Sequence, residues 1–88
     1  MRDEWRKNQQ LAANAFELTK ELLPNQWLAE IHNLIYEVNE WGEGFEWLVD
    51  ALLENNAAIS QTQKRAIDAA ADAMSLNCGQ ENLLVADS

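Results

Sequence analysis

Few side chains in this sequence have the type and spacing that catalysis requires. His32 is the only histidine, the side chain that most often acts as a general acid or base near neutral pH. It falls at the edge of an apolar helical stripe, where a partly buried structural histidine is the commoner role. Cys78 is the only cysteine, which excludes an intrachain disulfide and any zinc site built from several cysteines. We therefore expect that the protein is not an enzyme.

Motifs for metal and phosphate binding are also missing from the sequence. Carboxylate-bridged metal sites in helical bundles use Glu-x-x-His on two helices, but Glu30 stands two residues before His32 and no second histidine follows. Asp and Asn do not recur at the alternate positions of a calcium-binding loop. Gly42 and Gly44 lack the third glycine and the Lys-Ser/Thr pair of a phosphate-binding loop. We expect neither a metal nor a cofactor.

The elements that carry these side chains are expected to be helices. Helix-forming residues dominate, and no alternating β-branched run is long enough to form a strand. The sequence therefore predicts an all-α fold, a small antiparallel bundle of about four helices in one domain spanning residues 1–88. The helices are expected at residues 3–23, 26–41 and 43–55, and from residue 60 onwards.

The predicted helix boundaries depend on a few punctuating residues. Pro24 stops the first helix, and Asn25 is the expected N-cap of the second. Gly42 is expected to end the second helix in a left-handed conformation, and Gly44 to let the chain turn before the third. Residues 60–63 read Ser-Gln-Thr-Gln, which is typical of a capping box at the start of the fourth helix.

The last part of the chain has two expected features. The fourth helix should bury a face of small residues that permits close helix packing, namely Ala66, Ile67, Ala70, Ala73 and Met74. Residues 77–88 form a tail that is either docked as an extended segment or flexible.

Charge excludes some classes of partner and favours another. Fifteen acids against six bases give a net charge of −9, which repels the nucleic-acid backbone. Lys20 and Lys64 bracket 43 residues that contain eight acids and no Lys or Arg, so the natural complement is a basic protein. No run of about 18 apolar residues could span a bilayer, and the N-terminus lacks a signal-peptide pattern. We expect a cytoplasmic protein that contacts neither membrane nor nucleic acid directly.

Helical periodicity places several acids and tryptophans near the predicted turn at Gly42. At about 100° per residue, Trp47 shares one line of the third helix with Asp50 and Glu54, outside the core. Trp41 lies on the border of the acidic line of the second helix, and core packing is its alternative role. Ordinary solvated helix faces are also charged, but large aromatics among acids are typical of protein interfaces. The candidate partner-binding residues are Glu37, Glu40, Trp41, Glu43, Glu46, Trp47, Asp50 and Glu54.

The stretch from Asn39 to Glu54, NEWGEGFEWLVDALLE, followed by Ile59-Ser60 and by Met74-Ser75-Leu76, resembles the MafI-like immunity proteins. The resemblance covers about half of the chain. It implies a small helical cytosolic protein encoded beside a polymorphic bacterial toxin, such as those of contact-dependent inhibition systems. It also implies that the protein neutralises the C-terminal nuclease domain of that toxin, an RNase more often than a DNase, with EndoU-type RNases among the candidates.

The charge pattern and the resemblance lead to the same expectation. A nuclease presents a basic groove to its substrate, and an acidic helical face can occlude that groove. The expected function is therefore inhibition of a cognate toxin nuclease by direct binding. The alternative is a helical adaptor or regulatory protein that self-associates, weakly or stably, through the small-residue face of the fourth helix.

Overall fold

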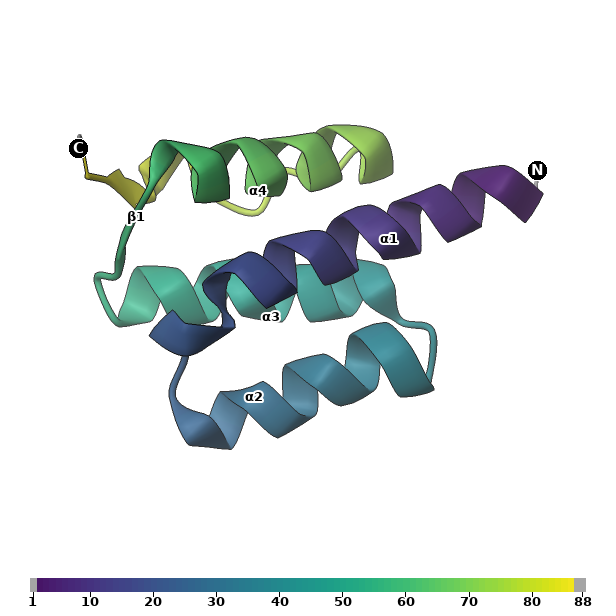
Figure 1. Cartoon of the computed structure of the whole chain (residues 1–88), viewed down its shortest axis with the longest axis horizontal. Coiled ribbons are helices and arrows are strands. Elements are labelled where there is room, and N and C mark those ends of the chain that lie inside the picture. The colour runs from purple at the N-terminus through teal and green to yellow at the C-terminus, as the bar shows by residue number, and fades with distance from the viewer. Residues whose placement is uncertain (1, 87–88) are drawn as a thin grey trace.

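The computed structural model describes residues 2–86, and four α-helices make up most of this range (Figure 1). They are α1 (Arg2–Thr19), α2 (Asn25–His32), α3 (Trp41–Glu54) and α4 (Gln61–Met74). Three shorter turns accompany them: η1 (Lys20–Leu22), the π-helical η2 (Asn33–Glu37), which continues α2, and η3 (Gln80–Asn82). The predicted helical class with about four helices is confirmed for the described residues. Among their helices, none has the length and apolarity needed to cross a membrane.

Pro24 separates the first two helices as predicted, but it also takes the capping position that was assigned to Asn25. Leu23 and Pro24 are extended, and Asn25 is already the first residue of α2. The carbonyl of Pro24 accepts hydrogen bonds from the backbone N–H groups of Trp27 and Leu28. No side chain caps this helix, so the prediction of an Asn25 cap is wrong. A proline with extended ψ supplies the same carbonyl without needing its own N–H.

The predicted junction at Gly42 is wrong, because the second helix ends at Glu37 and α3 begins at Trp41. Asn39 adopts a left-handed conformation with φ of 57°, which asparagine tolerates better than most residues, and the chain turns there. Gly42 lies inside the first turn of α3. Gly44 is buried against η2, and a Cβ at this position would come within 2.7 Å of Ile35 Cγ1. The role of Gly44 is therefore close packing rather than a turn.

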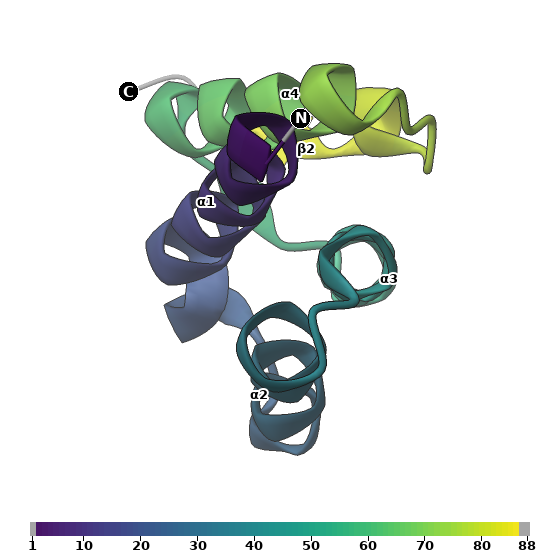
Figure 2. The same ribbon diagram turned by 90° about the vertical axis from the view of Figure 1, so that its right-hand side faces the viewer.

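The core lies where α3 packs against α1 and against α2 with η2, and where α1 packs against α4 (Figure 2). Phe45, Leu48 and Leu52 of α3 are fully buried, and Ile31 and Ile35 approach them from α2 and η2. The α1 helix packs against both α3 and α4. Small residues form part of the buried surface on both sides of the α1–α4 contact, namely Ala12, Ala15, Ala66, Ala70 and Ala71. One member of the predicted small-residue face of α4, Ala73, is exposed instead, and Val38 after η2 is also exposed.

The capping box at the start of α4 is confirmed. The Ser60 hydroxyl accepts a hydrogen bond from the Gln63 N–H at 3.1 Å, and the Gln63 carboxamide oxygen accepts one from the Ser60 N–H at 2.7 Å. The amide nitrogen of Gln63 also donates to the Leu18 carbonyl at 2.7 Å. This cap therefore fixes the start of α4 against the end of α1.

The expectation of no strand is wrong in one small region. β1 (Ala58–Ile59) pairs in parallel with β2 (Leu84–Val85), with α4 as the connection between them. Ala86 N–H donates to the Ile59 carbonyl at 2.8 Å, and the side chain of Leu83 is buried. Strands of two residues are too short to show an alternating pattern. Of the two alternatives for the tail, docking holds for residues 77–86; residues 87 and 88 lie outside the described range.

A candidate protein-binding surface on α2 and α3

Net charge is concentrated in the segment that runs from α2 to α3. Residues 25–54 contain seven acids and no Lys or Arg. In contrast, α1 with η1 holds four acids and four bases, and α4 holds two of each. Lys20 forms an ion pair with Glu17 at 2.7 Å, and Lys64 forms one with Asp68 at 2.8 Å. Each of these two cations is therefore paired with an acid of its own helical segment. The segment from α2 to α3 therefore carries most of the net negative charge of the protein.

The exposed side of α3 forms a continuous strip of acids around one tryptophan. The carboxylates are exposed, and the Trp47 side chain among them is half-buried and packs against the core with its inner part, so the prediction that it lies outside the core holds only in part. Residues three and four apart lie on the same helical face, which places Trp47 next to both Glu43 and Asp50. The opposite face of the helix is in the core. We call this set the α3 strip: Glu43, Glu46, Trp47, Asp50 and Glu54.

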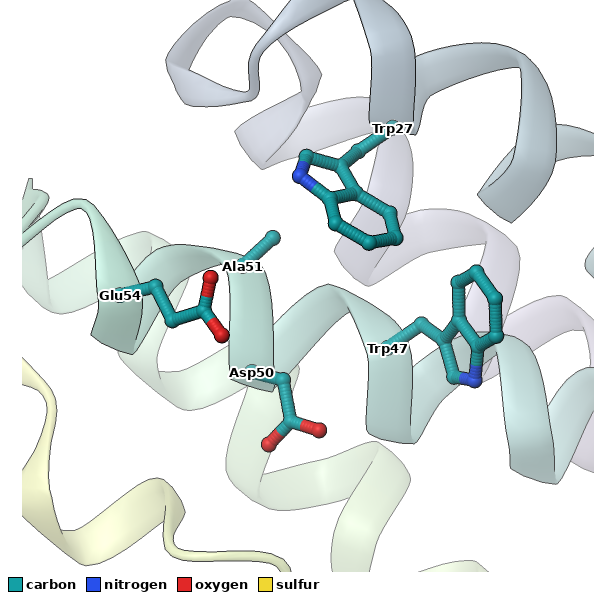
Figure 3. Close-up of a pocket in the computed structure, with 5 residues that line it drawn as sticks. All are labelled: Trp27, Trp47, Asp50, Ala51 and Glu54. Carbon is teal, nitrogen blue, oxygen red and sulfur yellow. The ribbon is translucent and has the colours of Figure 1, made fainter.

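One edge of the α3 strip meets α2 at a pair of tryptophans. The indole rings of Trp27 and Trp47 pack edge to face, with their centroids 5.4 Å apart and their planes at 78°. Next to them is a pocket of about 120 Å³, lined by these two rings together with Asp50, Ala51 and Glu54. Figure 3 shows Trp27 reaching down from α2, while the other four residues project from α3. The pocket therefore combines aromatic walls with two carboxylates.

The other edge of the α3 strip meets the C-terminal segment. A Cβ at Gly42 would lie 4.0 Å from Leu76 Cδ1, and one at Gly79 would lie 3.4 Å from Leu53 Cδ1. Between these two contacts, Cys78 is half-buried. Burial raises the pKa of its thiol to about 11, and the carboxylates of Glu46 and Asp50 contribute in the same direction. The docked tail thus shapes the edge of the strip and keeps its thiol protonated near neutral pH.

The structure brings together five of the eight predicted binding residues and separates the other three. Glu37 is the last residue of η2 and Glu40 lies on the connection to α3; both are exposed and precede the strip in the sequence. Trp41 is half-buried and packs against the core. Its spacing of four and seven residues from Phe45 and Leu48 puts it on the buried side of α3. Trp41 therefore stands apart from the α3 strip, on the side of α3 that faces the core.

Trp27 is not among the predicted binding residues. Trp27 occupies the first turn of α2 and is half-buried beside Trp47. Its type and its position on a helical stripe favour burial, and the structure shows that it is partly buried. Its place in the pocket depends on how α2 lies across α3, which periodicity within one helix does not reveal.

A second polar surface lies between α1 and α2, away from the α3 strip. His32 is exposed rather than partly buried, and its ring stacks on that of Tyr36 with 4.5 Å between centroids. The Tyr36 hydroxyl donates to the Glu17 carboxylate at 3.0 Å. Hydrogen bonds from Lys20 and then from Tyr36 lower the pKa of Glu17, and burial raises that of Tyr36. These contacts tie η2 to α1.

The side chains of the α3 strip are suited to recognition. Exposed carboxylates attract and pair with cations, and indole faces bind cations and cover apolar area. Within residues 2–86, no three His, Cys, Asp or Glu side chains converge as a metal site would require. Comparison of the chain with models of protein families, with curated proteins and with solved structures gives no match.

Proposed function

We propose that this protein is an immunity protein that binds a cognate bacterial toxin nuclease, an RNase more readily than a DNase, and blocks its basic substrate-binding surface with the α3 strip. The strip is presented by an antiparallel helical bundle that acts in the cytoplasm, without catalysis of its own. The observation that carries the proposal is the segregation of charge, since residues 25–54 hold seven acids and no base. The resemblance of residues 39–54 to MafI-like immunity proteins supports the choice of a toxin as the partner.

The physical argument starts from what a nuclease must expose. A groove that binds the phosphate backbone is lined with Lys and Arg, and a surface of opposite sign accelerates encounter with it. An inhibitor of a lethal enzyme benefits from such steering, because capture must precede cleavage. Affinity after encounter requires buried anchors as well as charge, and Trp47 with its neighbour Trp27 supplies aromatic area at the edge of the strip.

The competing hypothesis of self-association through α4 gains no support from the packing. Ala66, Ala70 and Ala71 are buried in the monomer, where α4 packs against α1. A face that is already covered cannot dimerise unless the two helices separate. The α3 strip also disfavours self-association, because two copies of a surface of one sign repel each other.

The proposal is tested by inhibition of the nuclease domain encoded by the gene immediately upstream. The purified domain is incubated with RNA and, separately, with DNA, in the presence of increasing amounts of this protein. We expect cleavage to stop at an equimolar ratio. A charge-reversed variant, Glu46→Lys with Asp50→Lys, should need a large excess. Continued cleavage with excess folded wild-type protein, or an upstream gene without a nuclease domain, would refute the proposal.

The matched control for that variant changes charge equally but away from the strip. Glu21 lies on η1 and Asp72 on α4, and both side chains are exposed. Glu21→Lys with Asp72→Lys therefore shifts net charge by the same amount as the strip variant. We expect this control still to stop cleavage at an equimolar ratio, because only its association rate should fall. Equal loss in the two variants would mean that only net charge matters.

A further inference from the structure

We infer that the pocket beside Trp27 and Trp47 receives one arginine side chain of the basic protein partner. This inference rests on the proposed function for the existence of such a partner, and it adds the identity of the group that is recognised. The pocket is lined by Trp27 from α2 and by Trp47, Asp50, Ala51 and Glu54 from α3 (Figure 3). Each of these residues restricts the occupant in a different way.

The size of the pocket selects a single side chain. Its volume of about 120 Å³ is well below the roughly 300–1,000 Å³ of sites that hold small-molecule substrates. An apolar protein cavity of about 150 Å³ is large enough for a benzene ring. One planar group of smaller size, such as a guanidinium with part of its aliphatic stem, therefore matches the available space.

The walls of the pocket favour a flat cation. Trp27 and Trp47 meet at 78°, so the edge of one ring faces the other and both keep indole surface at the pocket. Tryptophan binds cations over its face more strongly than tyrosine or phenylalanine does. A guanidinium is planar and weakly hydrated, and it stacks on an aromatic ring while keeping its in-plane N–H donors available. An ammonium group lacks this flat stacking surface.

Two acids that line the pocket can accept hydrogen bonds from those donors. Asp50 and Glu54 are four residues apart on α3 and follow Trp47 by three and seven residues, which places all three on one side of the helix. Both carboxylates are exposed. Ala51 forms the wall between them and Trp27, and its small side chain leaves the space open. A guanidinium in the pocket, stacked on the face of one indole, can thus donate to two carboxylates.

The occupant is expected from another molecule because of where the bases of this chain are. The segment that builds the pocket lies within residues 21–63, which contain no Lys or Arg. Lys20 and Lys64, the nearest bases in sequence on either side, are bonded to Glu17 and Asp68. An arginine from the partner would therefore meet two carboxylates that these bases do not neutralise.

The test uses a small probe instead of the nuclease, so that its result is independent of the inhibition assay. Protein labelled with ¹⁵N gives one indole N–H signal for each of its four tryptophans, assigned with Trp→Phe variants. N-acetyl-arginine amide is titrated at constant ionic strength, and the same titration is made with the lysine and citrulline analogues. Citrulline has nearly the shape of arginine without its charge, and lysine has the charge without the plane.

We expect the arginine probe to shift the Trp27 and Trp47 signals most, the lysine probe to shift them less, and citrulline to leave them unchanged. The variant Asp50→Asn with Glu54→Gln should reduce the arginine response to the level of citrulline. The control Glu43→Gln with Glu46→Gln removes two charges of the same strip outside the pocket and should keep the response.

Several outcomes would overturn the inference. Equal shifts with arginine and lysine, or equal loss in the two variants, would show attraction by general negative charge alone. Equal shifts with citrulline would show an apolar cavity without charge recognition, and no shift at either indole would exclude the pocket. In each case inhibition of the nuclease could still succeed in its own assay, so failure of this inference and failure of the proposed function are separate results.

Discussion

Gly44 of α3 touches the π-helical turn at Ile35 so closely that a Cβ at Gly44 would lie 2.7 Å from Ile35 Cγ1 and 3.1 Å from Leu34 Cβ. Both neighbours belong to the segment that follows α2, so the missing side chain sets the distance between η2 and α3. The same packing of the second helix segment on α3 positions Trp27 over the α3 strip. The proposed binding surface therefore depends on a glycine that does not belong to it.

Gly44→Ala should destabilise the protein, because the added methyl group overpacks this contact. Overpacking costs about 1–3 kcal/mol, which exceeds the advantage of about 1 kcal/mol that alanine has over glycine within a helix. The matched control is Gly42→Ala, two residues earlier in α3, where the added Cβ would meet Leu76 Cδ1 at an ordinary 4.0 Å. It should be neutral or stabilising. Urea unfolding measures both, and equal midpoints for the two variants would contradict the packing role.

Leu83→Ala should cost far more stability than Leu84→Ala. Leu83 is 6% exposed and packs into the core cluster, whereas its neighbour Leu84 is 52% exposed. Truncation of a buried leucine costs about 2–5 kcal/mol, and a surface substitution usually stays within about 0.5 kcal/mol. The two variants remove the same atoms one residue apart, so unfolding midpoints compare them directly. A small effect at Leu83 would mean that the tail does not dock in solution.

Loss of the capping box should weaken the start of α4. Ser60→Ala removes the acceptor for the Gln63 N–H, and N-cap substitutions of this kind cost about 0.5–2 kcal/mol. Thr62→Ala, at an exposed position in the same turn, should change the free energy of unfolding by less than about 0.5 kcal/mol. Chemical denaturation followed by circular dichroism distinguishes them. Identical unfolding curves for the two variants would be incompatible with a stabilising cap.

The sequence predicted those features that depend on neighbouring residues. The Ser60–Gln63 box, the stop at Pro24 and the acidic face around Trp47 each follow from spacing within one element, and each is found. The parallel pairing of residues 58–59 with 84–85 has no local pattern. Gly42 was misread because a glycine that ends a helix and one that lies inside its first turn look alike without the tertiary contact.

Prediction from the sequence has the same limit at the candidate site, where residues of two helices meet in the pocket. Asp50, Glu54 and Trp47 could be grouped from the sequence because they share a helix. Trp27 lies beside them only because α2 packs on α3. Trp41 lies apart from them, because its spacing from Phe45 and Leu48 places it on the side of α3 that faces the core. Local periodicity identifies faces, whereas tertiary packing decides which faces meet.

The raised pKa of Cys78 predicts a loss of stability at alkaline pH. The native thiol titrates at about 11 instead of its usual 9.0, mainly because it is buried. The folded state thus favours the protonated thiol. The contribution of this thiol to the free energy of unfolding is complete below pH 9 and is lost as pH rises through about 11. Tyr36, whose pKa is also raised, acts in the same direction, so the Cys78 part is obtained by comparison with Cys78→Ala.

That comparison has two readouts. The difference in free energy of unfolding between the wild type and Cys78→Ala should change across this pH window and be constant below it. Thiolate absorbance of the native protein should rise near pH 11, and that of the urea-unfolded chain near pH 9. A native thiol that titrates at the unfolded value would contradict the docking of residues 76–80 beside α3.

The most direct test of the central claim, that the α3 strip is the docking face for a basic nuclease, is the dissociation rate of the complex. Surface plasmon resonance at two salt concentrations compares Glu46→Lys/Asp50→Lys with Glu21→Lys/Asp72→Lys. Because net charge changes equally, both variants should lose association rate through weaker steering. Only the strip variant should also dissociate faster, since close pairs and the Trp47 anchor act after encounter. Equal dissociation rates for the two folded variants would contradict the claim.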